Sequence, residues 1–278
     1  MIYLGLAILS SAMVSVCMRL STNRVKGNVA MLAMNYFMCL ILACCFTGPG
    51  NLAPAVPSFP TTVGLGLING AFYLASFACM QRNIEKNGVV LSATFMKLGL
   101  LVPIVISVVF FHEIPSAVQV VGFCVAVTAI LLINLKHEGA AVQAPLGLVL
   151  LLLTGGISDA MSKIYEEVGD RALSEQFLVY TFASALVLCL LLMVLKKQRI
   201  GLSELGFGLL IGIPNFFSSR FLLLALKQIP AVITYPTYSV SAILLITLIG
   251  VLVFRERISR RQWLGLGMII LALTLLNI

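Results

Sequence analysis

The sequence predicts an all-α membrane protein with ten transmembrane helices arranged as two inverted five-helix repeats. Of its 278 residues, 60% are hydrophobic and only 10% are charged, and the mean hydropathy is +1.09. Soluble domains carry about 25% charged residues. The apolar runs are roughly 18 to 24 residues long, which is the length of a helix that crosses a bilayer. A repeat of the first half of the chain in the second half predicts the inverted arrangement.

The two halves share a pattern of aromatic, acidic, amide and glycine residues. Glu113 follows one apolar run and Glu256 follows another, 143 positions later. Each glutamate has Phe two positions before it, Gln six positions after it and Gly nine positions after it. Each half holds five spans, and because five is odd, the second half enters the membrane from the opposite side. Inverted repeats of this kind are common in secondary transporters, with the binding site between the repeats.

In the first half we expect spans at about 2–20, 28–48, 61–81, 88–111 and 116–135. Each is an apolar run bounded by a short polar or proline-containing break, and the longest break runs from Gly48 to Pro60. Pro103 falls within the fourth span, where it removes a backbone hydrogen bond and can kink the helix.

In the second half we expect spans at about 145–165, 174–195, 204–226, 231–254 and 261–277. Pro214 and Pro236 fall inside spans beside polar residues, and a carbonyl freed by proline must be satisfied by protein or by water in a cavity. The break from Lys136 to Ala144 separates the halves. We therefore place the first repeat at residues 1–138 and the second at residues 144–278.

Basic residues are concentrated in the connections after the first, third, fifth, seventh and ninth spans. Twelve lie there: Arg24, Lys26, Arg82, Lys86, Lys136, Lys196, Lys197, Arg199, Arg255, Arg257, Arg260 and Arg261. The other connections hold only Arg171 and Lys227. The positive-inside rule assigns the basic connections to the cytoplasm, so both termini are expected to face outward.

Beyond the first two positions of each span, five charged side chains fall inside the spans, namely Arg19, Lys97, Asp159, Lys163 and Arg220. Each costs about 2.5–3.5 kcal/mol at a helix centre, so such groups usually face a cavity or a partner. Lys97 is expected to meet substrate or a coupling proton, or else to pair with Asp159 for structure alone. Asp159 and Lys163 share one helix face. Together with Arg19 they are the candidates for proton coupling. The alternatives are a simple ion pair for the first two and, for Arg19, a side chain that reaches the interface.

Neutral polar side chains in several spans are expected to line a cavity. Arg220 is suited to hold a carboxylate or phosphate through two hydrogen bonds. The expected substrate-binding residues are Lys97, Arg220, Asn35, Tyr73, Asn215, Tyr235 and Tyr238. Each neutral residue taken alone is more often part of a helix–helix hydrogen bond or an anchor at the membrane interface. Four cations against one anion inside the spans favour an anionic or zwitterionic substrate.

No pattern in the sequence indicates an enzyme, a metal site, a cofactor or a nucleic-acid partner. His112-Glu113 lacks the second histidine of a zinc-protease motif. The seven cysteines lack the spacing of metal ligands. The net charge of +8 comes from short connections and not from one continuous basic face.

The segment from Pro103 to Glu113, followed by Gln119 and Gly122, resembles the signature of the drug/metabolite transporter superfamily, EamA type. The second copy, ending Phe254-Arg255-Glu256-Arg257 and continuing to Gln262 and Gly265, is similar too, with Ile246 where the first has Pro103. The resemblance covers the whole chain as five plus five helices. It implies a central cavity between the repeats, alternating access, and export or exchange of metabolites. It also implies that both termini lie in the cytoplasm, opposite to the charge count.

We therefore expect a secondary-active transporter, an exporter or exchanger, for a small polar anionic or zwitterionic metabolite such as an amino acid or organic acid. The alternatives are a proton-coupled multidrug exporter and a non-transporting scaffold or flippase-type subunit. The expected partners are the small-molecule substrate, the lipid bilayer and protons as coupling ion, in a monomer or homodimer. The expected location is the bacterial cytoplasmic membrane, as a multi-pass integral protein.

Overall fold

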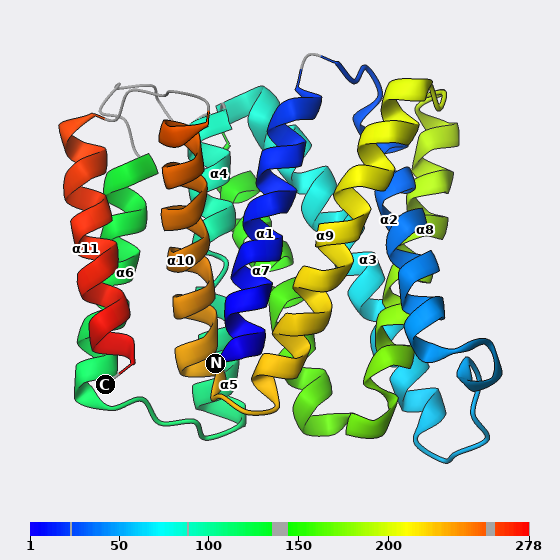
Figure 1. The fold of residues 1–278 in the computed structure, drawn as a ribbon, viewed down its shortest axis with the longest axis horizontal. Coiled ribbons are helices and arrows are strands. Elements are labelled where there is room, and N and C mark those ends of the chain that lie inside the picture. Colours follow the sequence, from blue (N-terminus) through cyan, green and yellow to red (C-terminus); the bar gives the residue numbers. More distant parts are fainter. Residues whose placement is uncertain (23, 88, 135–143, 254–258, 278) are drawn as a thin grey trace. The chain divides into compact units, whose positions relative to one another are not determined.

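The computed structural model describes residues 1–22, 24–87, 89–134, 144–253 and 259–277 (Figure 1). Within these ranges, eight helical segments are long and apolar enough to cross a membrane. The apolar helix Ala117–Ile133 is shorter, and α11 (Arg260–Leu276) is the last helix of the chain. Together these segments account for the ten predicted spans, so the all-α membrane fold is confirmed.

The fourth predicted span is confirmed as one membrane-length segment, Ser92–Phe110, but it consists of two helices. Helix α4 (Val89–Leu98) ends just before Gly99, and α5 (Leu101–Phe110) begins two residues later. Pro103 explains the break, because it has no N–H to donate to the carbonyl four residues earlier. The N–H of Val102 donates to that Gly99 carbonyl instead, at 3.0 Å.

The chain forms two compact units, and each unit combines segments from both halves of the sequence. Unit 1 contains Met1–Leu74 and Ile164–Lys227, and unit 2 contains Ala75–Lys163 and Gln228–Ile278. Helices α3 (Phe59–Asn87) and α7 (Pro145–Val168) contribute to both. The repeat boundaries at 1–138 and 144–278 describe the sequence and stay a prediction.

Unit 1 is built around two helices that pack against α9. Its complete helices are α1 (Ile2–Ser21), α2 (Asn28–Thr47), η1 (Pro49–Asn51), η2 (Arg171–Leu173), α8 (Ser174–Leu195) and α9 (Leu202–Leu226). Helices α1 and α2 lie beside α9, and α2 also lies beside α8 (Figure 1). Aromatic rings fill its core, among them Tyr36, Phe177, Phe182 and Phe216.

Two pairs of glycines let helices of unit 1 approach closely. Gly208 and Gly212 lie one turn apart on α9, and a Cβ at either position would lie 2.7 Å from a backbone oxygen of α2. Gly66 and Gly70 on α3 face α8 in the same way, and a Cβ at Gly70 would lie 2.5 Å from the Thr181 oxygen. Small residues at this spacing favour close helix packing in membranes.

Side chains from the α8–α9 region cap the start of α2. Gln198 Oε1 accepts hydrogen bonds from the N–H groups of Val29 and Ala30, at 3.1 and 3.2 Å. Glu204 Oε1 accepts from the N–H groups of Lys26 and Gly27, at 2.9 and 3.1 Å. The first N–H groups of a helix have no partner within the helix, so these contacts satisfy donors that would otherwise be left open.

Unit 2 contains the broken helix and the two C-terminal helices. Besides α4, α5 and α11, its helices are α6 (Ala117–Asn134) and α10 (Ala231–Leu252). Helix α6 lies beside α11, and α10 contacts α5, α6 and α11. Asn83 Nδ2 donates to the Gly147 carbonyl at 2.8 Å, which joins α3 to α7 within this unit.

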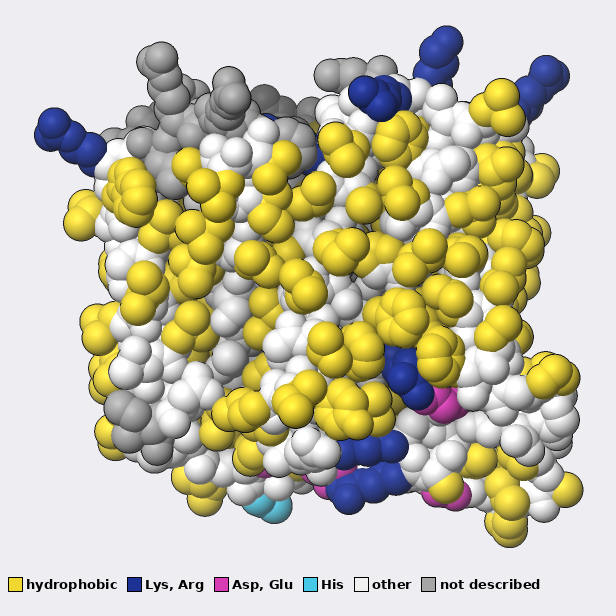
Figure 2. All heavy atoms as spheres, viewed as in Figure 1, with side chains coloured by type: hydrophobic (Ala, Val, Ile, Leu, Met, Phe, Trp, Pro, Cys, Tyr) yellow, Lys and Arg dark blue, Asp and Glu magenta, His cyan; other side chains and the backbone are white. Residues whose placement is uncertain are grey.

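Large apolar side chains are exposed along the helices, as expected for surfaces that face lipid. Figure 2 shows hydrophobic side chains over most of the visible face, with Lys and Arg concentrated near helix ends. On α1, for example, Leu9 and Met13 are each 49% exposed. Such surfaces are stable in a bilayer and support the membrane assignment.

Candidate functional site

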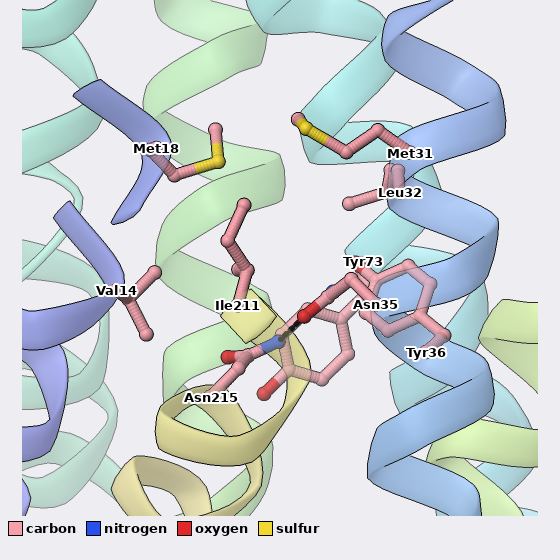
Figure 3. Close-up of a pocket in the computed structure, with 9 residues that line it drawn as sticks. All are labelled: Val14, Met18, Met31, Leu32, Asn35, Tyr36, Tyr73, Ile211 and Asn215. Carbon is pink, nitrogen blue, oxygen red and sulfur yellow. Dashed lines mark hydrogen bonds between the residues drawn. The ribbon is translucent and has the colours of Figure 1, made fainter. Parts of the chain in front are cut away.

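Unit 1 contains a pocket at the middle of its helices. Its volume is about 160 Å³, and its lining residues are Val14, Met18, Met31, Leu32, Asn35, Tyr36, Tyr73, Ile211 and Asn215. They come from α1, α2, α3 and α9 (Figure 3). Three of the expected substrate-binding residues, Asn35, Tyr73 and Asn215, line this one pocket.

The amides of Asn35 and Asn215 meet at the pocket. Asn215 Nδ2 donates to Asn35 Oδ1 at 3.2 Å. Gly212 is one turn before Asn215 and brings the α9 backbone against α2, so that the two short side chains can reach each other. One hydrogen bond between two amides uses one N–H and one oxygen, whichever way each amide is turned. Within the described part of the chain, the pair thus retains an NH₂ group and an oxygen for a ligand.

Two tyrosines extend the polar side of the pocket. The Tyr73 hydroxyl and Ser219 Oγ form a hydrogen bond of 3.4 Å. The rings of Tyr36 and Tyr73 are 5.9 Å apart between centroids and are tilted by 57°. Tyr36 is 4% exposed and belongs to the aromatic core, which holds its ring in place.

The other end of the pocket is apolar. Figure 3 shows Met18 and Met31 at one end and the amides and phenols at the other. Methionine side chains are flexible and adapt to ligands of different shape. The pocket therefore suits a small molecule with a polar end and an apolar end.

Unit 2 brings Lys97 and Asp159 together. Lys97 is in the last turn of α4, next to the helix break, and Asp159 is on α7. Their charges are close enough to interact. Gly99 and Gly156 make this possible, because a Cβ at Gly156 would lie 2.5 Å from the Gly99 oxygen. The Asp159 side chain is exposed at mid-helix, where a carboxylate is tolerated when it faces water or a partner.

The hydroxyl group of Tyr235 contacts the backbone beside the Asp159 side chain, so Tyr235 is close to the Lys97–Asp159 pair. The side chain is 2% exposed and donates to the Asp159 carbonyl at 2.7 Å, which joins α10 to α7. Tyr238 is one turn further along α10 and is partly buried. The expected roles of both tyrosines in substrate binding stay predictions.

Lys163 pairs with Glu113, although the sequence placed it with Asp159. Lys163 Nζ lies 2.7 Å from Glu113 Oε1, and its side chain is only 3% exposed. The ammonium group also lies 5.8 Å from the centre of the Phe111 ring. Lys163 is thus buried against a carboxylate from the connection after α5. Glu256, the counterpart of Glu113 in the repeat, lies outside the described residues.

Arg220 is bound to a carboxylate that the protein itself supplies. Its Nη2 and Nε lie 2.7 and 2.8 Å from Glu175 Oε1, and its guanidinium group lies 4.4 Å from the centre of the Phe46 ring. The sequence did not indicate Glu175 as the partner of Arg220. Among the described residues, the buried Glu175 Oε2 has no hydrogen-bond partner.

These pairs change the charge balance inside the spans. Glu113 and Glu175 lie at span ends, so a count restricted to span interiors omitted them. They neutralise Lys163 and Arg220, while Arg19 is exposed in the last turn of α1. The expected excess of buried positive charge is therefore largely compensated, and it no longer favours an anion over a zwitterion.

Charged groups also surround the connection between α7 and α8. Ser58 Oγ donates to Asp170 Oδ2 at 2.7 Å and the Ala172 N–H donates to Oδ1 at 2.9 Å, which lowers the pKa of Asp170. Lys227 Nζ donates to the Arg171 carbonyl at 3.0 Å, and partial burial lowers the pKa of Lys227. Both contacts hold the loop against the ends of neighbouring helices in unit 1.

The helices and their apolar surfaces define a multi-pass integral membrane protein. Residues 144–278 match the EamA-like transporter family. An uncharacterized protein of Haemophilus influenzae is 27% identical over 213 residues, which cover 74% of this chain and 71% of the relative. A crystal structure with 14% identity has a TM-score of 0.79 and covers 99% of this chain and 94% of its own, a likeness of fold alone.

Residues 144–278 thus match the EamA-like family, which is part of the drug/metabolite transporter superfamily, and the resemblance seen in the sequence is confirmed for this part of the chain. This family match indicates a transporter.

Proposed function

We propose that the protein is a secondary-active exporter or exchanger for a small zwitterionic metabolite of amino-acid size. The observation that carries this proposal is the pocket of about 160 Å³ with the Asn35–Asn215 amide pair at its polar end. Secondary transporters bind substrate near the middle of the membrane, and both asparagines lie well inside their helices.

The size and lining of the pocket support a small amphipathic substrate. A cavity of about 150 Å³ is large enough to hold benzene, so this pocket holds roughly six to ten non-hydrogen atoms. The free NH₂ group of the amide pair can donate to a carboxylate, and the free oxygen can accept from an ammonium group. Met18 and Met31 then contact the apolar part of the substrate.

The charge balance supports a zwitterion over an organic anion. No lysine or arginine lines the described pocket. Lys163 and Arg220 are already paired with Glu113 and Glu175. An anion without its own cationic group would therefore gain little compensation for the loss of its hydration.

We propose Asp159 as the group that takes up the coupling proton, with Lys97 as its charged neighbour. Carboxylates inside membranes serve as proton relays in transporters. The Lys97 ammonium group is a nearby cation that can offset the charge of the Asp159 carboxylate after the proton has left. Lys163, with its own carboxylate partner, has a structural role in this scheme.

We place the protein in the bacterial cytoplasmic membrane, with the basic connections on the cytoplasmic side. The distribution of lysine and arginine supports this orientation, and the relative from Haemophilus influenzae supports the bacterial setting. Single cysteines placed at Arg199 test the orientation, because a membrane-impermeant reagent applied from outside should not label them.

Flux into proteoliposomes tests the proposed substrate class. The panel contains radiolabelled small amino acids, organic acids, sugar phosphates and a lipophilic cation, each with and without a pH gradient. We expect uptake of at least one small amino acid, and we expect Asn215→Ala to raise its KM about tenfold, the loss of roughly one charge-assisted hydrogen bond.

Asn69→Ala is the matched control, because Asn69 is also a buried amide of unit 1 but lies outside the pocket lining. It should leave the KM for the transported amino acid within about twofold. Transport of the lipophilic cation alone would favour the multidrug alternative. Absence of flux for every compound, in a folded protein, would favour the scaffold or flippase-type alternative.

A further inference from the structure

Glu113 lies in the connection after α5, and its carboxylate joins two helices of unit 2. Glu113 Oε1 pairs with Lys163 Nζ on α7 at 2.7 Å. Glu113 Oε2 accepts the N–H of Val232, in the first turn of α10, at 3.2 Å. One carboxylate thus bridges the end of α7 and the start of α10.

The local backbone fixes the direction of this carboxylate. The N–H groups of Phe111 and Glu113 both donate to the Ser107 carbonyl, at 3.2 and 3.1 Å. His112 between them has a φ of 54°, a left-handed conformation that reverses the chain. The chain therefore folds back over the end of α5 and presents Glu113 to α7 and α10.

A second contact joins the same two helices one turn away. The Tyr235 hydroxyl donates to the Asp159 carbonyl at 2.7 Å. Tyr235 follows Val232 by three residues on α10, and Asp159 precedes Lys163 by four residues on α7. Residues three or four apart lie on the same face of a helix. The two contacts therefore form a closed ring of five residues, Glu113, Val232, Tyr235, Asp159 and Lys163.

From this ring we infer that Glu113 is a positioning residue for Asp159. It holds the first turn of α10 against α7, and Tyr235 then fixes the part of α7 that carries the Asp159 carboxylate. The inference rests on the proposed function only for its effect on transport; the mechanical link between Glu113 and α10 stands on the contacts alone.

Because the Glu113–Lys163 pair is largely buried, the loss of either charge should have a large effect on the contact with α10. Lys163 is 3% exposed and Glu113 is 16% exposed at the side chain. Removing one partner of such a pair takes an opposite charge away from a buried group, which is destabilising. The N-terminus of α10 also loses a negative charge that its helix dipole favours. Loss of Glu113 charge should therefore loosen α10 at its first turn and displace Asp159.

Three variants separate these effects. Glu113→Gln keeps the size and an acceptor for the Val232 N–H but removes the charge that Lys163 needs. Lys163→Met keeps the carboxylate but removes its partner, and Lys163→Arg restores a cation. Glu85→Gln, at an exposed position of α3, is the matched control.

Hydrogen–deuterium exchange of the peptide that covers residues 231–235 reports whether the first turn of α10 is held in place. Proteoliposome flux reports whether Asp159 can perform its proposed role in transport. We expect Glu113→Gln and Lys163→Met to raise the exchange rate of this peptide about tenfold and to lower the maximum flux about tenfold. The KM should stay within about twofold, because the residues do not touch the substrate. Lys163→Arg should restore both readouts, and Glu85→Gln should change neither.

Unchanged exchange at 231–235 in both charge-removing variants would overturn the inference. So would a change confined to KM, or failure of Lys163→Arg to restore exchange. If the wild-type protein moves no compound, the proposed function fails, while the exchange measurement still decides whether Glu113 holds α10. If Glu113→Gln does not fold, Lys163→Met and Lys163→Arg give the same comparison.

Discussion

Replacement of Gly156 by alanine tests how the Lys97–Asp159 centre is assembled. Gly156 on α7 touches the helix break, and an added Cβ would lie 2.5 Å from the Gly99 oxygen and closer still to the Val102 side chain. A carbon–oxygen contact normally measures about 3.3–3.6 Å. The two backbones must therefore separate by about 1 Å, and overpacking of this kind costs roughly 1–3 kcal/mol.

Gly155→Ala is the control, because Gly155 is the adjacent residue on the same helix. A Cβ there meets only the Ser76 hydroxyl, at 3.3 Å, which can rotate away. Both substitutions gain the same helix propensity, about 0.5–1 kcal/mol. The difference between the two variants thus isolates the steric cost, which we expect to be about 1–3 kcal/mol.

Thermal unfolding in detergent measures this difference. A loss of 1 kcal/mol lowers the Tm of a protein of 150–250 residues by about 2–4 °C, so Gly156→Ala should melt roughly 2–12 °C below Gly155→Ala. Its flux should fall as well, because Lys97 moves away from Asp159. Equal melting temperatures for the two variants would refute the idea that the Gly99–Gly156 contact sets this geometry.

Two further predictions concern unit 1. Arg220→Lys should lower the Tm although it keeps the charge, because lysine cannot reproduce the two short contacts to Glu175 and the stacking on the ring of Phe46; an unchanged Tm would show that only charge matters there. Ser58→Ala should lower the Tm at neutral pH, and the deficit should shrink as the pH falls. The sign follows from the lowered pKa of Asp170: its stabilising contribution is present above its unfolded-state pKa and is lost as pH falls through the folded-state pKa. A Tm difference that is independent of pH would contradict this assignment.

The number and order of the spans could be predicted from the sequence because bilayer thickness fixes the length of an apolar helix. The break at Gly99 could not be predicted from apolarity, since one apolar run continues from α4 into α5. Pro103 was recognised as a source of a kink, but proline gives either a kink or a break according to what packs against it. Here Gly156 packs against the freed backbone, and that neighbour comes from the other half of the chain.

The candidate site was predicted in part. Asn35, Tyr73 and Asn215 are polar residues in the middle of apolar helices, which is an unusual position, and the structure brings them to one pocket. The partners of the charged residues were harder to find. Glu113 and Glu175 are separated by 50 and 45 residues from Lys163 and Arg220, respectively, and only the tertiary fold brings each pair together.

The repeat explains why the pocket has two kinds of polar group. Gly66 and Gly70 on α3 occupy positions equivalent to Gly208 and Gly212 on α9, and both pairs bring a helix backbone against its neighbour.

Three residues after the second glycine of each pair, the first copy has Tyr73 and the second has Asn215, and both residues line the pocket. The same packing geometry thus presents a phenol from one repeat and an amide from the other. A symmetric pair of side chains would offer a ligand two identical groups. Because Tyr73 and Asn215 offer different groups, the pocket is chemically asymmetric, and a molecule with distinct ends binds best in one orientation.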